Sequence, residues 1–306
     1  MGEVTDEPLR TILRPPLPVD LGLTLATLAS GKPHPCVRRD RDGSWWRATR
    51  TPLGPATTRF VPSDGGIGAE AWGPGKEWAL DAAPELLGSR DPVDGFDPAP
   101  GIVRDLHRRM PGLRIARSRA VFEALAPTIL EQKVPGAEAF ATYRNLVRAF
   151  AEPAPGPGGL RLPPSPDALA RTPYPEFHPL GIERRRADTL RAAASRAVRL
   201  EEAVLMPLPE AYRRIQAFPG VGPWSAARVA MVALGDADAV PLGDYHFPHM
   251  VAWALMGRPR GTDEQMLELL KPFPGHRGRV LRLLLAAGVS PPRYGPRMSL
   301  RSIERI

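Results

Sequence analysis

The spacing of apolar residues changes once along this 306-residue chain, at about residue 95. Before that point, short runs rich in β-branched and aromatic residues alternate with turn clusters such as Arg41-Asp42-Gly43, which is typical of a half-buried antiparallel sheet. After it, apolar residues recur at three- and four-residue spacing, which is typical of amphipathic helices. We therefore predict an α+β fold, in which an N-terminal antiparallel sheet subdomain precedes a mostly helical region.

The same patterns predict the individual elements. Strands are expected at 11–14, 36–39, 45–51, 57–61 and 67–72, and two helices, 20–29 and 77–87, are expected to cover one face of their sheet. Further helices are expected at 101–109, 120–132, 136–150, 182–200, 209–217, 224–234, 245–256, 263–270 and 278–287. The proline- and glycine-rich segment 152–166 is predicted to be a loop without chemistry of its own. The expected domains are 1–95, 96–290 and a C-terminal tail, 291–306.

The balance of charge favours a polyanionic partner. Lysine and arginine total 41 residues against 33 aspartates and glutamates, which gives a formal net charge of +8 and a pI near 10.2. Nucleic acid is the leading candidate for this partner, and an anionic membrane surface is the second. The first residues lack the pattern of a secretory signal, and no apolar stretch approaches the length of a membrane span. We therefore expect a cytoplasmic protein that has no membrane partner.

The single cysteine, Cys36, limits the cofactors that the chain can hold. One thiol cannot form an internal disulfide framework, a cysteine-ligated zinc site or an iron–sulfur cluster. We therefore expect no metal site built from side chains and no iron–sulfur cluster.

A short glycine motif carries the strongest functional signal. The sequence Phe-Pro-Gly-Val-Gly at 218–222 connects an amphipathic helix to a second helix that begins at once. Gly220 and Gly222 allow a sharp turn whose amides face outward with no Cβ in the way. The start of the second helix adds unpaired N–H groups and the positive end of its dipole, so a phosphate could bind there without regard to base sequence. The alternative is a plain connection with a glycine at a helix C-cap.

A second signal follows twenty residues after Trp224, where Gly243-Asp244-Tyr245 precedes another predicted helix. Asp244 stands at or next to the N-cap of that helix. Capping alone would explain an aspartate there, with a contribution of roughly 1 kcal/mol to stability. The alternative explanation is functional: the aspartate places a carboxylate at this distance from a phosphate-binding hairpin.

Together these motifs resemble the signature of the helix-hairpin-helix/Gly-Pro-Asp DNA glycosylases, and within them the DNA-3-methyladenine glycosylase II branch. The segments 122–134 and 180–182 resemble the family's DNA-entering loop and the segment before its hairpin, so the resemblance covers about residues 100–290. The first hundred residues are similar to the extra N-terminal domain of this branch. The resemblance implies a monomeric bacterial repair enzyme of the nucleoid, whose partner is double-stranded DNA with a flipped damaged base.

The resemblance also implies a mechanism. Breaking an N-glycosidic bond builds positive charge on the sugar, and the carboxylate of Asp244 would stabilise that charge and align or deprotonate the attacking water. Relatives that also cut the strand carry a lysine where this chain has Trp224, so the implied enzyme is monofunctional. Trp224 and Tyr245 would line the pocket and stack on an electron-poor purine, although packing in the core would also explain both.

The residues expected to contact DNA are Gly220, Val221, Gly222, Ser225, Gln132 and Lys133. Some of the nearby arginines are expected to reach phosphates as well; they are Arg213, Arg214, Arg228, Arg277, Arg279 and Arg282. Lys133 departs from the branch, which usually presents an apolar wedge there to fill the gap that a flipped base leaves. Leu285 departs too, because it stands where the branch has a pocket tryptophan. In this family the hairpin carbonyls, here of Gln216, Phe218 and Val221, hold a monovalent cation, which is the one cofactor that the resemblance implies.

Three functions stay open at this point. The first is a monofunctional glycosylase for alkylated purines of the 3-methyladenine and 7-methylguanine type, acting in base excision repair. The second is a glycosylase for deaminated or etheno-modified purines, which the altered Lys133 and Leu285 suggest. The third is a helix-hairpin-helix protein that binds DNA without catalysis, against which the spacing of Asp244 argues.

Overall fold

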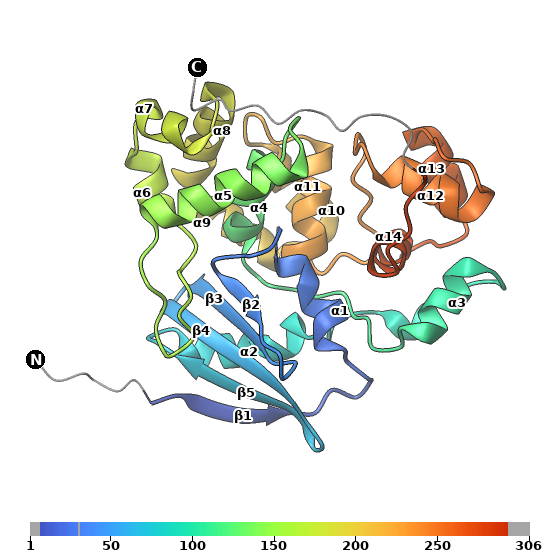
Figure 1. The fold of residues 1–306 in the computed structure, drawn as a ribbon, viewed down its shortest axis with the longest axis horizontal. Helices are drawn as coiled ribbons and strands as arrows, with labels where there is room; N and C mark the ends of the chain where they lie inside the picture. Colours follow the sequence, from blue (N-terminus) through green and yellow to red (C-terminus); the bar gives the residue numbers. More distant parts are fainter. Residues whose placement is uncertain (1–6, 30, 293–306) are drawn as a thin grey trace, which may run out of the picture.

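The computed structural model describes residues 7–29 and 31–292 and confirms the predicted α+β fold (Figure 1). Its N-terminal part holds one antiparallel sheet in the order β1-β5-β4-β3-β2. The strands are β1 (Leu9–Leu13), β2 (Val37–Arg39), β3 (Trp45–Thr51), β4 (Gly54–Ser63) and β5 (Gly66–Trp72). Most of the predicted tail, 291–306, lies outside the described residues.

The predicted cover on one face of the sheet is present. It consists of α1 (Leu21–Leu25) with the 3-10 turn η1 (Ala26–Leu28), and of α2 (Lys76–Leu86). Leu25 of α1 and Leu80 of α2 are buried in one apolar cluster with Phe60 of β4. Successive strand residues point to opposite faces, so Trp45 belongs to this cluster while its neighbour Trp46 belongs to another.

The second face of the sheet packs against the helical region. Trp46 and Trp72 stack at 5.5 Å between ring centroids, inside the cluster that holds buried residues of the helical segment 121–234. The predicted loop 152–166 lies here as well, because the amide of Arg161 donates to the carbonyl of Pro35 and a Cβ on Gly158 would lie 2.9 Å from the Trp46 ring. This loop therefore helps to join the sheet to the helices.

The helical region contains more helices than the sequence predicted. They are α3 (Ile102–Arg109), α4 (Val121–Leu130), α5 (Gly136–Phe150), α6 (Pro166–Arg171), α7 (Tyr174–Phe177), α8 (Arg184–Ala194), α9 (Ala197–Glu201), α10 (Leu208–Gln216), α11 (Pro223–Val229), α12 (Phe247–Met256), α13 (Asp263–Leu270) and α14 (Arg277–Ala286). The additional helices α6 and α7 are too short to show a helical period. The predicted helix 182–200 is divided into α8 and α9 at Ser195 and Arg196.

The helices form two packing units. Residues of α4, α5, α8, α10 and α11 share one cluster, whereas α3 packs with α12, α13 and α14 in a second, at the right of Figure 1. A fully buried ion pair between Asp91 and Arg279 attaches the segment after the sheet subdomain to α14. The predicted domain boundaries stay predictions, but the two helical units leave a junction between α11 and the start of α12.

Within the described part of the chain, no helix combines the length and the apolar character that a membrane crossing requires.

Candidate active site and nucleic-acid interface

The glycine motif forms a tight hairpin between α10 and α11. The amide of Val221 donates to the carbonyl of Phe218 at 3.0 Å, and Gly220 has a φ of +82°. A Cβ on Gly220 would lie 2.4 Å from Oγ1 of Thr189 on α8, so both the backbone angle and the close packing require glycine. Gly222, at the N-cap of α11, is exposed and has open space where a Cβ would stand. The hairpin therefore presents accessible backbone at its tip.

Gln132 attaches the end of α4 to this hairpin. Its amide nitrogen donates to the carbonyl of Gly220 at 2.9 Å and to the hydroxyl of Ser225 at 3.0 Å. Ser225 is buried, whereas the neighbouring Lys133 is exposed and has a positive φ of +59°. Of the predicted DNA contacts, Gln132 and Ser225 thus support the hairpin from within, and Lys133 projects beside it.

Asp244 lies just before α12, and both of its carboxylate oxygens accept hydrogen bonds. Oδ1 accepts from the amides of His246 at 2.7 Å and Phe247 at 3.1 Å, so Asp244 binds the start of this helix although the N-cap itself is His246, two residues later. Oδ2 accepts from the indole Nε1 of Trp224 at 2.9 Å. The side chain is half-buried. These hydrogen bonds therefore orient the carboxylate, which stays partly accessible.

Trp224 connects the two helical units. It lies in the first turn of α11, directly after the hairpin, and its indole N–H crosses the junction to reach Asp244. The sequence predicted a pocket role for this ring but not the hydrogen bond. Tyr245 is 72% exposed and packs edge-on against His246 and His249, so its ring lies at the surface beside Asp244.

A small cavity lies between the sheet subdomain, α4 and the segment 228–232, and neither Trp224 nor Asp244 lines it. Arg228 follows Trp224 by one turn of α11 and lines the cavity, as does Val232 of the following π-helix η5 (Ala230–Leu234). Its other walls include Thr27 from the sheet subdomain and Pro127 from α4, and its volume is about 60 Å³. The cavity therefore marks the contact between the sheet subdomain and the helices.

Two arginines lie close enough to influence each other beside this cavity, and of the two only Arg228 lines it. Arg228 pairs with Glu131 at 3.1 Å, and its buried Nε has no hydrogen-bond partner within the described structure. Arg282 of α14 donates to the carbonyl of Leu23 at 2.8 Å. Burial, and after it the nearby charge of Arg228, lowers the pKa of Arg282 to about 10. The sequence indicated both residues only as phosphate contacts; the four-residue step from Trp224 was a signal for Arg228, but no local signal existed for Arg282.

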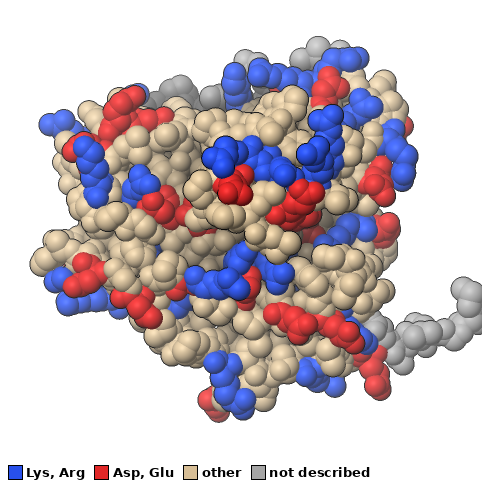
Figure 2. All heavy atoms as spheres, turned by 180° about the vertical axis from the view of Figure 1, so that it is seen from behind, with Lys and Arg blue, Asp and Glu red and all other residues tan. Residues whose placement is uncertain are grey.

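The other arginines expected to reach phosphates differ in their burial and in their ion pairs. Arg279 is buried with Asp91, Arg277 pairs with Asp238, and Arg214 pairs with Glu202. Arg213 is exposed and has no ion pair within the described residues. On the face in Figure 2, basic side chains alternate with acidic ones, so the positive net charge is not gathered into one continuous basic surface there.

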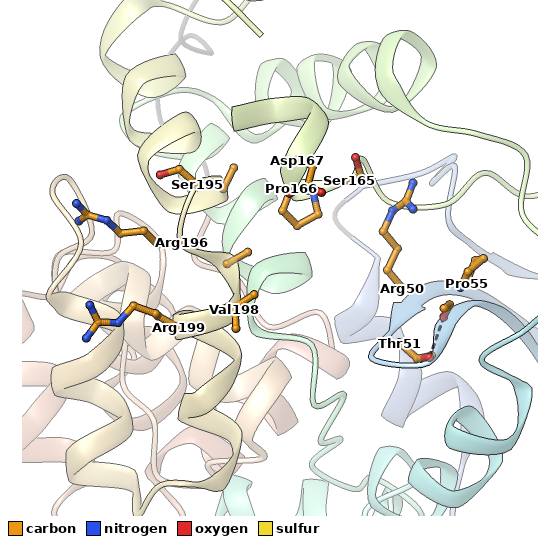
Figure 3. A pocket seen from close by; sticks show the side chains of 13 residues that line it. Arg50, Thr51, Pro55, Ser165, Pro166, Asp167, Ser195, Arg196, Val198 and Arg199 are labelled. Carbon is orange, nitrogen blue, oxygen red and sulfur yellow. Dashed lines mark hydrogen bonds between the residues drawn. The ribbon is translucent and has the colours of Figure 1, made fainter. Parts of the chain in front are cut away.

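A larger hollow of about 480 Å³ lies elsewhere (Figure 3). It separates the end of β3, at Thr51, from α6 and the α8–α9 connection at Ser195. None of the predicted site residues lines it, and in Figure 3 Arg196 and Arg199 extend away from Arg50. No set of groups converges there that would support catalysis.

Among the described residues, no cluster of three or more His, Cys, Asp or Glu side chains could hold a metal ion. Leu285, the second departure from the resembled branch, is 42% exposed on α14.

Comparisons with known proteins match this site. Residues 126–274 match the protein-family model described as "HhH-GPD superfamily base excision DNA repair protein". That region begins within α4 and includes the hairpin, Trp224 and Asp244.

Individual relatives match a larger part of the chain. A Mycobacterium tuberculosis protein named "Probable bifunctional transcriptional activator/DNA repair enzyme AlkA" is 30% identical over 173 residues, which cover 54% of this chain and only 32% of that protein. Among solved structures, a 3-methyladenine DNA glycosylase from Archaeoglobus fulgidus has a TM-score of 0.73 at 22% identity, covering 90% of this chain and 97% of that one. An 8-oxoguanine glycosylase/lyase from Clostridium acetobutylicum has a TM-score of 0.66 at 15% identity, covering 92% and 98%.

Proposed function

Because residues 126–274 belong to the HhH-GPD superfamily of base excision DNA repair proteins, we propose that this chain is a monofunctional DNA glycosylase. It binds double-stranded DNA, flips out a damaged purine and hydrolyses its N-glycosidic bond. Alkylated purines of the 3-methyladenine and 7-methylguanine type are the first candidate substrates. The name of the archaeal structural neighbour and the resemblance of the motifs to the 3-methyladenine branch support this choice.

One observation carries the proposal: the 2.9 Å hydrogen bond between Trp224 and Asp244. It joins the candidate catalytic carboxylate to the first turn of α11, the helix that begins directly after the exposed hairpin. A phosphate held at the hairpin would thus lie at a set position relative to the carboxylate. DNA binding at the hairpin and the reaction at Asp244 are therefore coupled through α11. The reaction takes place at a sugar next to the bound phosphate, so it requires a fixed distance between the hairpin and the carboxylate.

The proposed chemistry needs one carboxylate and one water. As the bond to the base breaks, positive charge develops on the sugar carbon, and Asp244 stabilises it through space. The water attacks the same carbon and loses its proton, for which the carboxylate is the nearest acceptor in the site. A purine alkylated at N3 or N7 leaves as a neutral base, so no strong general acid is assigned.

The absence of strand cleavage is proposed from a single residue. A lyase needs an amine that attacks the sugar and forms a Schiff base. The resembled family's lyases place it where this chain has Trp224, whose indole N–H cannot act as that nucleophile. The clostridial neighbour is named a glycosylase/lyase. The fold is therefore compatible with strand cleavage as well as with base release alone, and the residue at the position of Trp224 determines which of the two reactions occurs.

Three further parts of the proposal concern the DNA complex. Lys133, exposed beside the hairpin, fills part of the gap left by the flipped base with its methylenes and pairs with a phosphate. A monovalent cation binds the hairpin carbonyls, among which that of Phe218 already accepts from the amide of Val221. The protein acts as a monomer on the bacterial nucleoid.

A second candidate substrate is a neutral purine lesion, such as a deaminated or etheno-modified base. Arg228 favours it, because this positively charged side chain lies one turn of α11 beyond Trp224. A cationic purine gains nothing from such a neighbour.

The test is release of free base from methylated duplex DNA by the wild type and by Asp244→Asn. The wild type should free 3-methyladenine or 7-methylguanine and leave the strand intact until alkali is added. Asp244→Asn should free less than about one hundredth as much, while its affinity for DNA stays within about threefold. If neither protein frees any base from methylated, deaminated or etheno-modified DNA, the glycosylase proposal is wrong, and equal affinities would then leave a DNA-binding protein.

A further inference from the structure

We infer that Asp263 is a positioning residue for the candidate catalytic carboxylate. Through the backbone amide of Gly243, Asp263 fixes the loop from which the side chain of Asp244 projects. This inference rests on the proposed function and adds to it a residue that acts on the reaction through Asp244.

The loop before α12 has little support of its own. Its ends are buried at Pro241 and Phe247, whereas four of the five residues between them are exposed. Within the described residues, the main chain of 240–245 makes no hydrogen bond to another main-chain group. Between its buried ends, the loop is therefore held only where a side chain from another element reaches it.

Asp263 is the residue that reaches the main chain of this loop. The amide of Gly243 donates to Oδ2 of Asp263, in the first turn of α13, at 2.7 Å. Gly243 has a φ of +84°, a conformation that other residues rarely adopt. Within the described residues, no other hydrogen bond involves the main chain of 240–245. Asp263 thus sets the position of the residue that directly precedes Asp244.

Capping of α13 does not account for this contact. Thr262 already caps the helix, because its hydroxyl accepts from the amide of Gln265 at 3.3 Å and the side chain of Gln265 accepts from the amide of Thr262 at 3.1 Å. Oδ1 of Asp263 is buried and has no hydrogen-bond partner within the described residues, which is unfavourable. A favourable interaction with the helix dipole is the remaining alternative, and the exposed neighbour Glu264 shares it.

The start of α13 gives this hydrogen bond a rigid base. A Cβ on Gly261 would lie 2.5 Å from the carbonyl oxygen of Pro248, so the segment before α13 packs closely against α12. Met266 of α13 is fully buried in the same cluster as Phe247 of α12. Asp263 therefore holds the loop against a fixed part of the second helical unit.

The contacts of Asp244 and those of Asp263 act on different parts of the site. Trp224 and the helix amides hold the carboxylate oxygens of Asp244, whereas Asp263 holds the main chain one residue before it. A reacting group misplaced by about 1 Å can lower a rate on the order of a hundredfold. Loss of the bond to Gly243 should therefore slow base release. DNA affinity should be unaffected, because the hairpin belongs to the other helical unit.

The test is single-turnover release of 7-methylguanine from a methylated duplex, with DNA affinity measured by fluorescence anisotropy. Asp263→Ala removes the acceptor and should lower the rate about tenfold or more, with affinity within about twofold. Asp263→Asn loses the charge but keeps an acceptor oxygen, so it should recover most of the rate. Glu264→Ala is the matched control: it removes an acid from the same turn of α13 and should leave the rate unchanged.

Two further variants keep the test decisive. Asp263→Glu retains the acid in the first turn of α13 but moves its carboxylate by one methylene, so it should also slow release; it replaces Asp263→Ala if that variant unfolds. In the Asp244→Asn background, Asp263→Ala should not lower the residual rate further, because Asp263 acts through Asp244. A general loss of structure would lower the rate in both backgrounds.

A wild-type rate in Asp263→Ala, or equal losses in Asp263→Ala and Asp263→Asn, would overturn the role of Asp263 and leave the glycosylase proposal standing. Release of no base by the wild type would overturn both.

Discussion

Trp224 lies between the backbone hairpin and the candidate catalytic carboxylate, and its role depends on one atom. The indole Nε1 donates to Oδ2 of Asp244, while the helix amides hold Oδ1. The two sets of donors fix the plane of the carboxylate, because each oxygen is held from a different helix. The ring itself is half-buried and can also contact a base.

Replacing Trp224 by phenylalanine separates these two contributions. The aromatic face stays and the hydrogen bond is lost, and a hydrogen bond to a charged group is worth about 1.5–3 kcal/mol. We expect kcat for base release to fall about tenfold or more, with KM and DNA affinity nearly unchanged. Single-turnover rates and binding by fluorescence anisotropy would measure this; a fall in affinity with an unchanged rate would assign the residue to binding instead.

At the scale of elements, the hairpin and α8 fit together at a single glycine. Gly220 combines a positive φ with a Cβ position 2.4 Å from Oγ1 of Thr189. Gly222, two residues later, has φ −96° and no atom within 4 Å of its Cβ position. The two glycines of one motif therefore serve different purposes, the first for packing and the second for access to backbone amides.

The substitutions Gly220→Ala and Gly222→Ala test this division. Gly220→Ala should lower the free energy of unfolding by about 1–3 kcal/mol, from backbone strain and the contact with Thr189. Gly222→Ala should leave stability within about 0.5 kcal/mol, the range of ordinary surface changes, and weaken DNA binding because its methyl group stands in the path of a phosphate. Urea unfolding and salt-dependent binding would measure the two effects, and equal losses of stability would contradict the division.

At the scale of the whole molecule, the contact between the sheet subdomain and the helices holds a partly buried histidine. His34 stacks on Tyr143 of α5 at 5.3 Å and lines the cavity. Burial, with a smaller contribution from the charge of Arg144, lowers the pKa of His34 from 6.5 to about 4. The neutral form is therefore the one that the folded protein favours.

A lowered histidine pKa makes the fold sensitive to acid. Above pH 6.5 His34 is neutral in both the folded and the unfolded chain. Between pH 6.5 and about 4 the imidazole is protonated in the unfolded chain but stays neutral in the folded chain. The contribution to stability therefore decreases from pH 6.5 to about 4, by a total on the order of 2–3 kcal/mol.

Glu201 titrates in the opposite sense in the same range. Burial raises its pKa from 4.5 to about 7, despite two backbone donors at the start of α4. Its contribution is full below pH 4.5 and is lost as the pH rises through 7. The contributions of His34 and Glu201 therefore oppose each other over this pH range, and the measurement must be a difference: the free energy of unfolding of wild type minus that of His34→Gln should decrease as the pH falls from 6.5 to 4. A constant difference would show that His34 titrates normally.

Much of the architecture was predictable from local patterns. The strand β3 and the helix α5 have the predicted bounds, because hydrophobic periods of two and of about three and a half residues are properties of neighbouring side chains. The short helices α6 and α7 were missed, since one or two turns show no period. The division between α8 and α9 was missed because Ser195 and Arg196 do not interrupt the apolar spacing.

By itself the sequence determined the fold class, the glycine hairpin and the spacing of Asp244 from Trp224, because each depends on residues close together in the chain. The tertiary structure alone decided which groups touch. The Trp224–Asp244 bond, the attachment of Gln132 to the hairpin and the approach of Arg282 to Arg228 all join separate elements. The direction of a side chain across such a junction depends on how helices pack over long distances in sequence, and no local pattern records that packing.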